Sequence, residues 1–213
     1  MQDIPLETLM QAVADDLPIS SRENCLQKIQ HFLDLLLHWN EAFNLTAVRS
    51  KQDMIVKHIL DSLSVTDCVS YPLLDVGSGG GFPGIVLAIV APAQPMTLLD
   101  SNGKKVRFLK QCVHELQLDQ VCVVHSRVET LKTGSFNCII SRAYASLALM
   151  AKSCRHLVAP DGEMVAMKGK YPQSELKALP DDIIVANIQR VEVPFLNEER
   201  HIVRMKIRQP GSE

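Results

Sequence analysis

Hydrophobic residues recur at helical spacing along the first third of the chain. Ser20-Ser21-Arg22-Glu23 has the form of a capping box, in which a hydroxyl begins a helix and a carboxylate follows three residues later. Apolar residues then return every three or four positions as far as Trp39. Ser50-Lys51-Gln52-Asp53 predicts a second helix start with its own apolar face. We therefore expect two or three helices within residues 1–67.

The pattern changes at Pro72, where short apolar runs begin to alternate with helical stretches. The apolar runs predict strands at Leu73–Val76, Met96–Asp100, Val121–His125, Phe136–Ser141 and Gly162–Lys168. The stretches between them predict helices at Ile85–Val90, Gly103–Leu118 and Leu147–Leu157. Two further β-rich runs, Ile183–Pro194 and His201–Arg208, predict an antiparallel hairpin.

This order of elements predicts an α/β, Rossmann-like fold. Strands that alternate with helices form a mostly parallel sheet covered on both faces. The C-terminal antiparallel hairpin then closes one edge of that sheet. We expect residues 1–67 to be an N-terminal helical extension and residues 68–213 to be the main domain, packed as one compact unit.

A glycine-rich loop follows the first predicted strand, in the sequence Leu73-Leu74-Asp75-Val76-Gly77-Ser78-Gly79-Gly80-Gly81-Phe82-Pro83-Gly84. Glycine lets the backbone approach a ligand where a Cβ would collide, and free N–H groups at a helix start bind polar atoms. Gly79, Gly81 and Gly84 also match the G-x-G-x-x-G pattern of nicotinamide and flavin domains. The loop thus predicts a nucleotide-type ligand but leaves its identity open.

Two carboxylates narrow the choice of ligand. Asp75 stands two residues before Gly77, where it would repel a pyrophosphate and attract an amino group or a sulfonium. Asp100 ends the next strand and can accept hydrogen bonds from ribose hydroxyls, in NAD and in S-adenosylmethionine alike. Only about 110 residues follow Asp100, fewer than the substrate domain of a dehydrogenase usually needs. A sheet closed by a hairpin looks like the class I methyltransferase fold, which is an argument by analogy.

The composition of the chain argues against several classes of protein. The net charge is −2, which weighs against a DNA-coating protein, although residues 71–213 hold most of the Lys and Arg. No apolar run approaches the ~18 residues of a membrane span, and the first 30 residues do not resemble a secretory signal. None of the six cysteines forms a C-x-x-C pair, so we expect free thiols and no metal site. We expect a cytoplasmic monomer.

Several motifs together resemble one family, the bacterial 16S ribosomal RNA guanine-N7 methyltransferases, also called glucose-inhibited division protein B. They cover nearly the whole chain: Trp39-Asn40, Asn44-Leu45-Thr46, His58-Ile59-Leu60-Asp61-Ser62, the glycine loop, Leu98-Leu99-Asp100-Ser101, Lys104-Lys105-Val106-Arg107-Phe108-Leu109, Ser126-Arg127-Val128-Glu129, Ile140-Ser141-Arg142-Ala143 and Glu199-Arg200-His201. The resemblance implies S-adenosylmethionine as methyl donor. It implies guanosine 527, in the 530 loop of 16S ribosomal RNA, as acceptor.

The resemblance also implies contacts with the donor. These fall on Gly77, Phe82, Val128, Glu129 and Arg142. The glycine loop and the following strand add five more candidates, which are Asp75, Gly79, Gly81, Asp100 and Ser101.

The sequence lacks the motifs of methyltransferases that act on other atoms, which agrees with methylation of guanine N7. N7 carries a free lone pair, so the methyl transfer is an in-line displacement that needs positioning rather than a general base. Ser141-Arg142-Ala143-Tyr144 lacks the paired prolines of enzymes that methylate adenine N6. Cys138 lies inside a predicted strand and not after it, unlike the nucleophile of a 5-methylcytosine enzyme.

Basic and polar residues near predicted strand ends are the candidates for RNA contacts, because ligands bind at the carboxyl edge of such sheets. They are Arg127, Lys168, Lys170, Arg200 and His201, with Asn44 and His58 from the helical segment. Arg200 is also the candidate for positioning the guanine. Asn44 as a turn cap and His58 as a satisfied core group are equally good structural alternatives. Lys104, Lys105, Arg107 and Lys110 fit a solvated helix face about as well as an RNA contact.

Three other functions remain open at this point. They are a small-molecule methyltransferase, a nicotinamide-linked oxidoreductase, and a non-catalytic module that binds RNA or the ribosome. For the RNA enzyme, the partner is 16S ribosomal RNA, either free or within the small ribosomal subunit.

Overall fold

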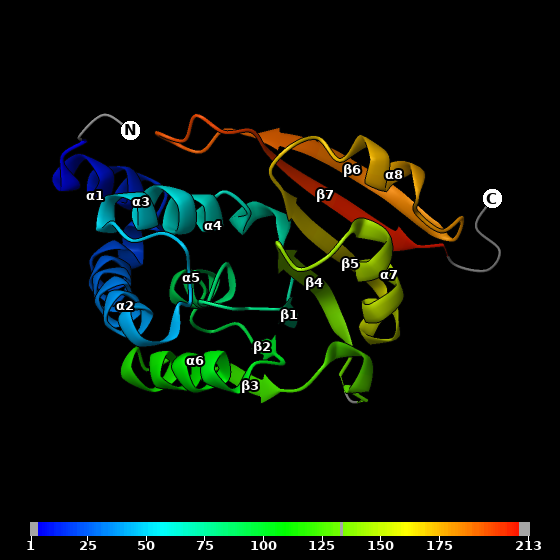
Figure 1. The fold of residues 1–213 in the computed structure, drawn as a ribbon, viewed down its shortest axis with the longest axis horizontal. Helices are drawn as coiled ribbons and strands as arrows, with labels where there is room; N and C mark the ends of the chain where they lie inside the picture. The colour runs from blue at the N-terminus through cyan, green and yellow to red at the C-terminus, as the bar shows by residue number, and fades with distance from the viewer. Residues whose placement is uncertain (1–3, 133, 209–213) are drawn as a thin grey trace.

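The computed structural model describes residues 4–132 and 134–208. A seven-stranded sheet lies between two layers of helices (Figure 1). Helices α1 to α6 cover one face, and α7 and α8 cover the other. This architecture confirms the predicted α/β fold.

The strands are short, and most match their predicted positions within a few residues. In chain order they are β1 Leu73–Val76, β2 Met96–Asp100, β3 Val121–His125, β4 Phe136–Arg142, β5 Val158–Lys168, β6 Ile183–Val191 and β7 Arg200–Ile207. The helices are α1 Leu6–Asp15, α2 Arg22–Phe43, α3 Lys51–Met54, α4 Asp61–Leu63, α5 Gly84–Val90, α6 Gly103–Glu115, α7 Leu147–Cys154 and α8 Gln173–Lys177.

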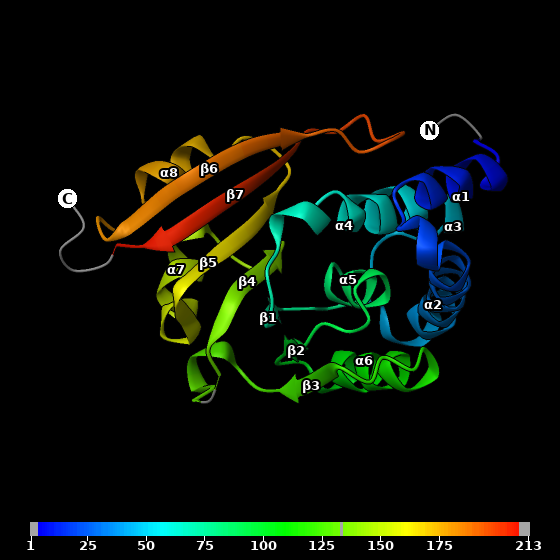
Figure 2. The same cartoon turned by 180° about the vertical axis from the view of Figure 1, so that it is seen from behind.

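The strand order is β3-β2-β1-β4-β5-β7-β6. The first five strands are parallel, and β7 runs antiparallel to both β5 and β6, which confirms the predicted hairpin. Seen from behind, β6 and β3 form the two edges (Figure 2). The order reverses between β1 and β4, and ligands bind at such a switch point, beyond the carboxyl ends of the strands.

Alternate side chains of the strands enter two separate cores. Leu73, Leu98 and Val165 face the larger helical layer, whereas their neighbours Leu74 and Leu99 face α7. All five are essentially inaccessible to solvent. A strand that is buried on both faces is apolar without alternation, which explains why these runs were readable in the sequence.

Helix α5 is enclosed on all sides. Each of its seven residues is buried, because it packs between the sheet, α2 and α4. A helix that is apolar all round belongs in an interior. The N-terminal helices therefore complete the same core as the sheet. Within the described part of the chain, no helix has the length and hydropathy to cross a bilayer.

Two local predictions were wrong, and one helix was missed. Helix α2 begins at Arg22 without a side-chain cap, because a 3₁₀ turn at Ile19–Ser21 places Ser20 inside helical backbone. The start at Ser50 is confirmed, since its hydroxyl accepts from the N–H of Asp53 at 3.0 Å. The helix that follows was expected to be regular, but Ile55–Leu60 is π-helical. Helix α8 was not predicted.

Gly84 is expected to tolerate no side chain. A Cβ there would stand closer than 3.0 Å to the side chains of Leu98 and Asp75, so Gly84→Ala should destabilise the fold by about 1–3 kcal/mol. At Gly103 the nearest atom would be 3.4 Å away, so Gly103→Ala should leave stability unchanged or raise it by up to about 1 kcal/mol. Urea unfolding of both variants tests this, and equal midpoints would contradict it.

Candidate functional site

Two cavities meet at the carboxyl edge of the sheet. The first encloses about 650 Å³ and is lined by Val76, Gly77, Leu99, Asp100, Ser101, Lys105, Ser126, Arg127, Glu129, Thr130, Ala143 and Tyr144. The second encloses about 630 Å³ and is lined by Val48, Lys57, His58, Asp61, Gly77, Ser78, Gly79, Gly80, Phe82, Lys105, Ala143, Arg142, Met167, Lys168, Gly169, Glu198 and Arg200. Gly77, Lys105 and Ala143 line both cavities.

The glycine loop separates the two cavities. Gly77 and Gly79 have φ of 73° and 58°, in the left-handed region that favours glycine. A Cβ on Gly77 would also stand 3.0 Å from the Tyr144 ring. The loop therefore exposes bare backbone toward both cavities.

Asp100 anchors this loop to the end of β2. One carboxylate oxygen accepts from the N–H of Gly79 at 3.0 Å, and the other accepts from the N–H of Asn102 at 2.8 Å. Asp100 and Glu129 are the carboxylates that line the first cavity within the described chain. Carboxylates accept hydrogen bonds from hydroxyl and amino groups, so this cavity suits a sugar and a base.

Asp75 was predicted to face the ligand, but its side chain lies outside the lining of both cavities. It is fully buried, lines neither cavity, and accepts from the N–H of Gly84 at 3.0 Å, which caps α5. Burial raises the pKa of this carboxyl to about 7, partly opposed by that hydrogen bond. Its other oxygen has no hydrogen-bond partner among the described residues. The geometry therefore supports a role in the loop and α5, and not the predicted contact with a ligand's amino group.

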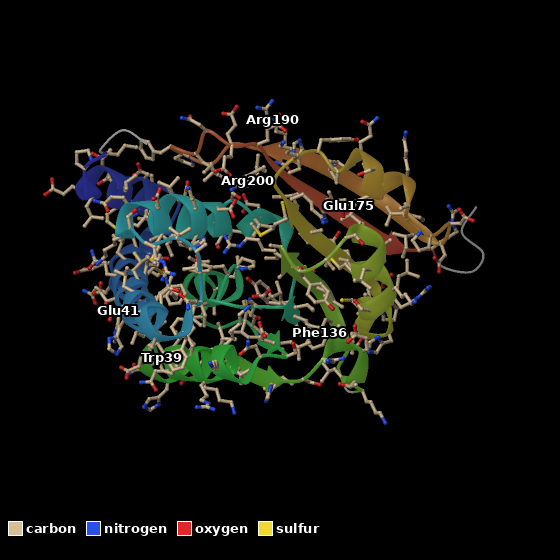
Figure 3. The ribbon with its side chains drawn as sticks, viewed as in Figure 1. Trp39, Glu41, Phe136, Glu175, Arg190 and Arg200 are labelled. Atoms are coloured by element: carbon tan, nitrogen blue, oxygen red, sulfur yellow. The ribbon has the colours of Figure 1, made fainter. Side chains whose placement is uncertain are left out.

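A buried carboxylate organises the second cavity. Asp61, only 2% exposed, accepts from Arg142 Nη1 at 3.0 Å and from Arg200 Nε at 2.8 Å. Arg200 also donates to Glu198 at 3.2 Å. Figure 3 shows Arg200 where β7 begins, next to α4. One carboxylate thus holds two guanidinium groups that are far from it in the sequence.

An aromatic and cationic stack lines the wall of this cavity. The Phe82 ring lies 4.5 Å from the ring of His58 and 4.9 Å from the guanidinium of Arg142, measured between centres. His58 Nε2 lies 2.8 Å from the hydroxyl of Thr46, and its Nδ1 lies 2.9 Å from the carbonyl of Lys57. Burial, with help from Arg142, lowers the pKa of His58 to about 4. The imidazole is therefore neutral at pH 7, and both its nitrogens are engaged.

Lys168 braces the segment that follows β4. Its ammonium donates to the carbonyl of Ala145 and to Glu175, both at 2.8 Å. Glu175 also accepts from the N–H of Leu147 at 2.7 Å and so caps α7. The unpredicted helix α8 supplies this glutamate.

The structure brings together most of the predicted site residues, but not all. Like Asp75, the predicted residues Gly81, Val128, Asn44, Lys170 and His201 line neither cavity. Asn44 ends α2 with φ of 49°, which agrees with the alternative interpretation of Asn44 as a turn cap. Arg127, predicted for RNA, lines the first cavity and not the second.

Other residues of the site had been given no role. They are Lys57, Asp61, Glu198, Tyr144 and Glu175. Asp61 stands three residues after His58 in one of the motifs, a spacing that places two side chains on one helix face. That spacing could have indicated from the sequence that Asp61 lies at the same site as His58.

Comparison with known sequences gives a consistent result. A family model described as rRNA small subunit methyltransferase G matches residues 25–203. A protein named ribosomal RNA small subunit methyltransferase G from Cronobacter sakazakii is 45% identical, over 90% of this chain and 94% of its own. One of the same name from Marinobacter nauticus is 48% identical, over 87% of each.

Solved structures share the fold at low identity. A ribosomal protein L11 methylase from Lactobacillus delbrueckii subsp. bulgaricus aligns with a TM-score of 0.53 and 14% identity, over 75% of this chain and 80% of its own. A tRNA (uracil-54, C5)-methyltransferase from Pyrococcus abyssi, in complex with S-adenosyl-L-homocysteine, aligns at 0.51 and 17%, over 68% and 37%. These likenesses confirm the class I methyltransferase fold.

The buried His58 should make stability depend on pH. The unfolded chain binds a proton at a pKa of 6.5 and the folded chain at about 4, so acid between these values favours unfolding. Relative to H58Q, the wild type should lose about 2–3 kcal/mol of unfolding free energy between pH 8 and pH 4.5. Urea unfolding at both pH values measures this. Exposed His38 offers a matched control, since H38Q should follow the wild type, and a pH-independent effect of H58Q would refute the prediction.

Proposed function

The chain belongs to the rRNA small subunit methyltransferase G family, and from this premise we propose that it methylates N7 of a guanine in 16S ribosomal RNA, with S-adenosylmethionine as donor. The coarser activity, methylation of small-subunit ribosomal RNA, follows from the family itself. Guanosine 527 of the 530 loop is the acceptor that the sequence motifs imply. Family membership removes the oxidoreductase and small-molecule alternatives.

The first cavity fits the adenosine end of the donor. Asp100 and Glu129 supply acceptors for hydroxyl and amino groups, and the backbone at Gly77 is open because no Cβ stands there. When bound, S-adenosylmethionine supplies an electrophilic methyl group on a positively charged sulfur. Gly77 and Ala143 line both cavities, so a ligand in the first can reach the second at this point.

The observation that favours N7 is the state of the possible bases in the second cavity. Asp61 and Glu198 are paired with arginines, and His58 is neutral with both nitrogens engaged. The described residues of this lining thus include no carboxylate or imidazole free to take a proton. An exocyclic amine must lose a proton during methylation, whereas N7 uses an existing lone pair.

A covalent mechanism through cysteine has no support. Cys138 is fully buried within β4, and burial raises the pKa of its thiol to about 12. A protonated, enclosed thiol is a poor nucleophile. We therefore propose that catalysis consists of holding the two reactants in line.

Arg200 would position the RNA. Its Nε is fixed by buried Asp61, but its Nη2 contacts Glu198, whose side chain is 58% exposed. Nη2 carries a second N–H, so a phosphate or guanine O6 can accept a hydrogen bond from it while Glu198 stays paired. Arg142, stacked on Phe82, would hold the donor side of the same cavity.

The donor site can be tested at Glu129. Replacement by Gln should weaken binding of S-adenosylhomocysteine about tenfold or more, because a charged acceptor is lost. Titration calorimetry gives the affinity. Glu41, exposed on α2 and remote from both cavities, is the matched control, and E41Q should bind as the wild type does (Figure 3). Unchanged affinity in E129Q would remove Glu129 from the donor site.

The acceptor atom and the role of Arg200 can be tested together. Borohydride and aniline cleave RNA at N7-methylguanine, so wild-type protein should produce one cleavage in 16S ribosomal RNA. Arg200→Ala should lower this methylation about 10–1000-fold and leave donor affinity nearly unchanged. Arg190→Ala, at an exposed arginine on neighbouring β6, should keep full activity (Figure 3).

The acceptor atom and the role of Arg200 can be refuted independently of each other. Methylated RNA that resists cleavage would refute N7 as the acceptor. Loss of donor affinity in step with activity in Arg200→Ala would refute only the assigned role of Arg200.

A further inference from the structure

Lys105 stands where the two cavities meet. It lies in the first turn of α6, is half-buried, and lines both cavities. Its ammonium reaches over the glycine loop, since a Cβ built on Gly79 would be 3.8 Å from Lys105 Nζ. The amine therefore lies at the junction between the donor side and the RNA side of the site.

Charge pairing sets Lys105 apart from the other cations of the second cavity. Each of the others has a carboxylate no more than 3.9 Å away: Lys57 has Asp53, Lys168 has Glu175, Arg142 has Asp61, and Arg200 has Asp61 and Glu198. Among described residues, Lys105 is the cation of this lining whose side-chain nitrogen has no hydrogen bond or ion pair; its backbone N–H donates to Asn102. A half-buried ammonium at a cavity without a partner is ready to bind an anion.

We propose that Lys105 binds a backbone phosphate of the RNA strand that carries the target guanine. The inference rests on the proposed function and adds a contact to it. The donor is the less suitable ligand, because its carboxylate already has its own ammonium and sulfonium, so the molecule is positive overall. Each RNA nucleotide, by contrast, brings one negative charge to the site.

The neighbouring lysine has other surroundings. The ammonium of Lys104 lies 5.8 Å from the ring centroid of Phe43, and the residue is exposed. Lys104 lines neither of the two cavities. The basic run on α6 therefore divides into one residue at the site and a neighbour with the same charge outside it.

The experiment compares Lys105→Gln with the matched variant Lys104→Gln. Binding to unmodified 16S ribosomal RNA is measured at several potassium chloride concentrations, and affinity for S-adenosylhomocysteine is measured by calorimetry. Lys105→Gln should weaken RNA binding about 5–10-fold near 0.1 M salt and reduce the slope of log affinity against log salt by about one. Lys104→Gln should change neither quantity by as much. Lys105→Arg should restore most of the affinity, and donor affinity should be unchanged in all three variants.

Three results would overturn the proposal. They are a normal salt slope in Lys105→Gln, an equal loss in Lys104→Gln, or a loss of S-adenosylhomocysteine affinity that matches the loss for RNA. The last result would assign Lys105 to the donor carboxylate. If the wild type itself failed to methylate 16S ribosomal RNA at N7, the proposed function would fail, whichever way the lysine variants behaved.

Discussion

The carboxylate of Asp61 holds the two halves of the second cavity, the proposed RNA side of the site, in place. Removing a carboxylate from water costs several kcal/mol, and the cost is offset only when charged partners and hydrogen bonds replace the water. Arg142, at the end of β4, and Arg200, at the start of β7, supply those partners. If either guanidinium left, the buried carboxylate would lose one of its two charged partners. Both are therefore oriented before RNA arrives, which is the condition under which fixed charges contribute most to catalysis.

The position of Asp61 depends in turn on the helical extension. Asp61 directly follows the π-helical segment Ile55–Leu60, and the Lys57 carbonyl within that segment accepts from Arg142 at 2.9 Å. A wider helical turn frees backbone groups that a regular helix would use internally, and such turns often occur at functional sites. The N-terminal helices thus have two functions. They bury α5, and they supply His58 and Asp61 to the wall of the second cavity.

The sequence predictions succeeded where the interacting residues are close together in the chain and failed where they are far apart. Strands β1, β2 and β3 were predicted to the residue, because each is a short and largely apolar run. The glycine loop and Asp100 were placed together because they are neighbours in a βαβ unit. The pairs of Asp61 with Arg142 and Arg200 span 81 and 139 residues, so no local pattern could reveal them. The hydrogen bond of Asp75 to the start of α5 was not predicted, because a carboxylate at a strand end can face either a ligand or the next helix start, and the sequence is the same in both cases.

The second cavity is basic, and the charge pairs in its wall reduce the repulsion that such a site would exert on a cationic product. In the proposed reaction, methyl transfer to N7 moves positive charge from sulfur to the guanine ring, so a wall of uncompensated cations would oppose it. Here Asp61 and Glu198 lie beside the arginines, and Glu175 neutralises Lys168. The arginines can then donate hydrogen bonds to RNA while each keeps a carboxylate beside it. Phosphate groups bring further negative charge when RNA binds. The paired carboxylates therefore do more than hold the arginines, because they keep the proposed RNA site compatible with the proposed reaction, whose product is a cation.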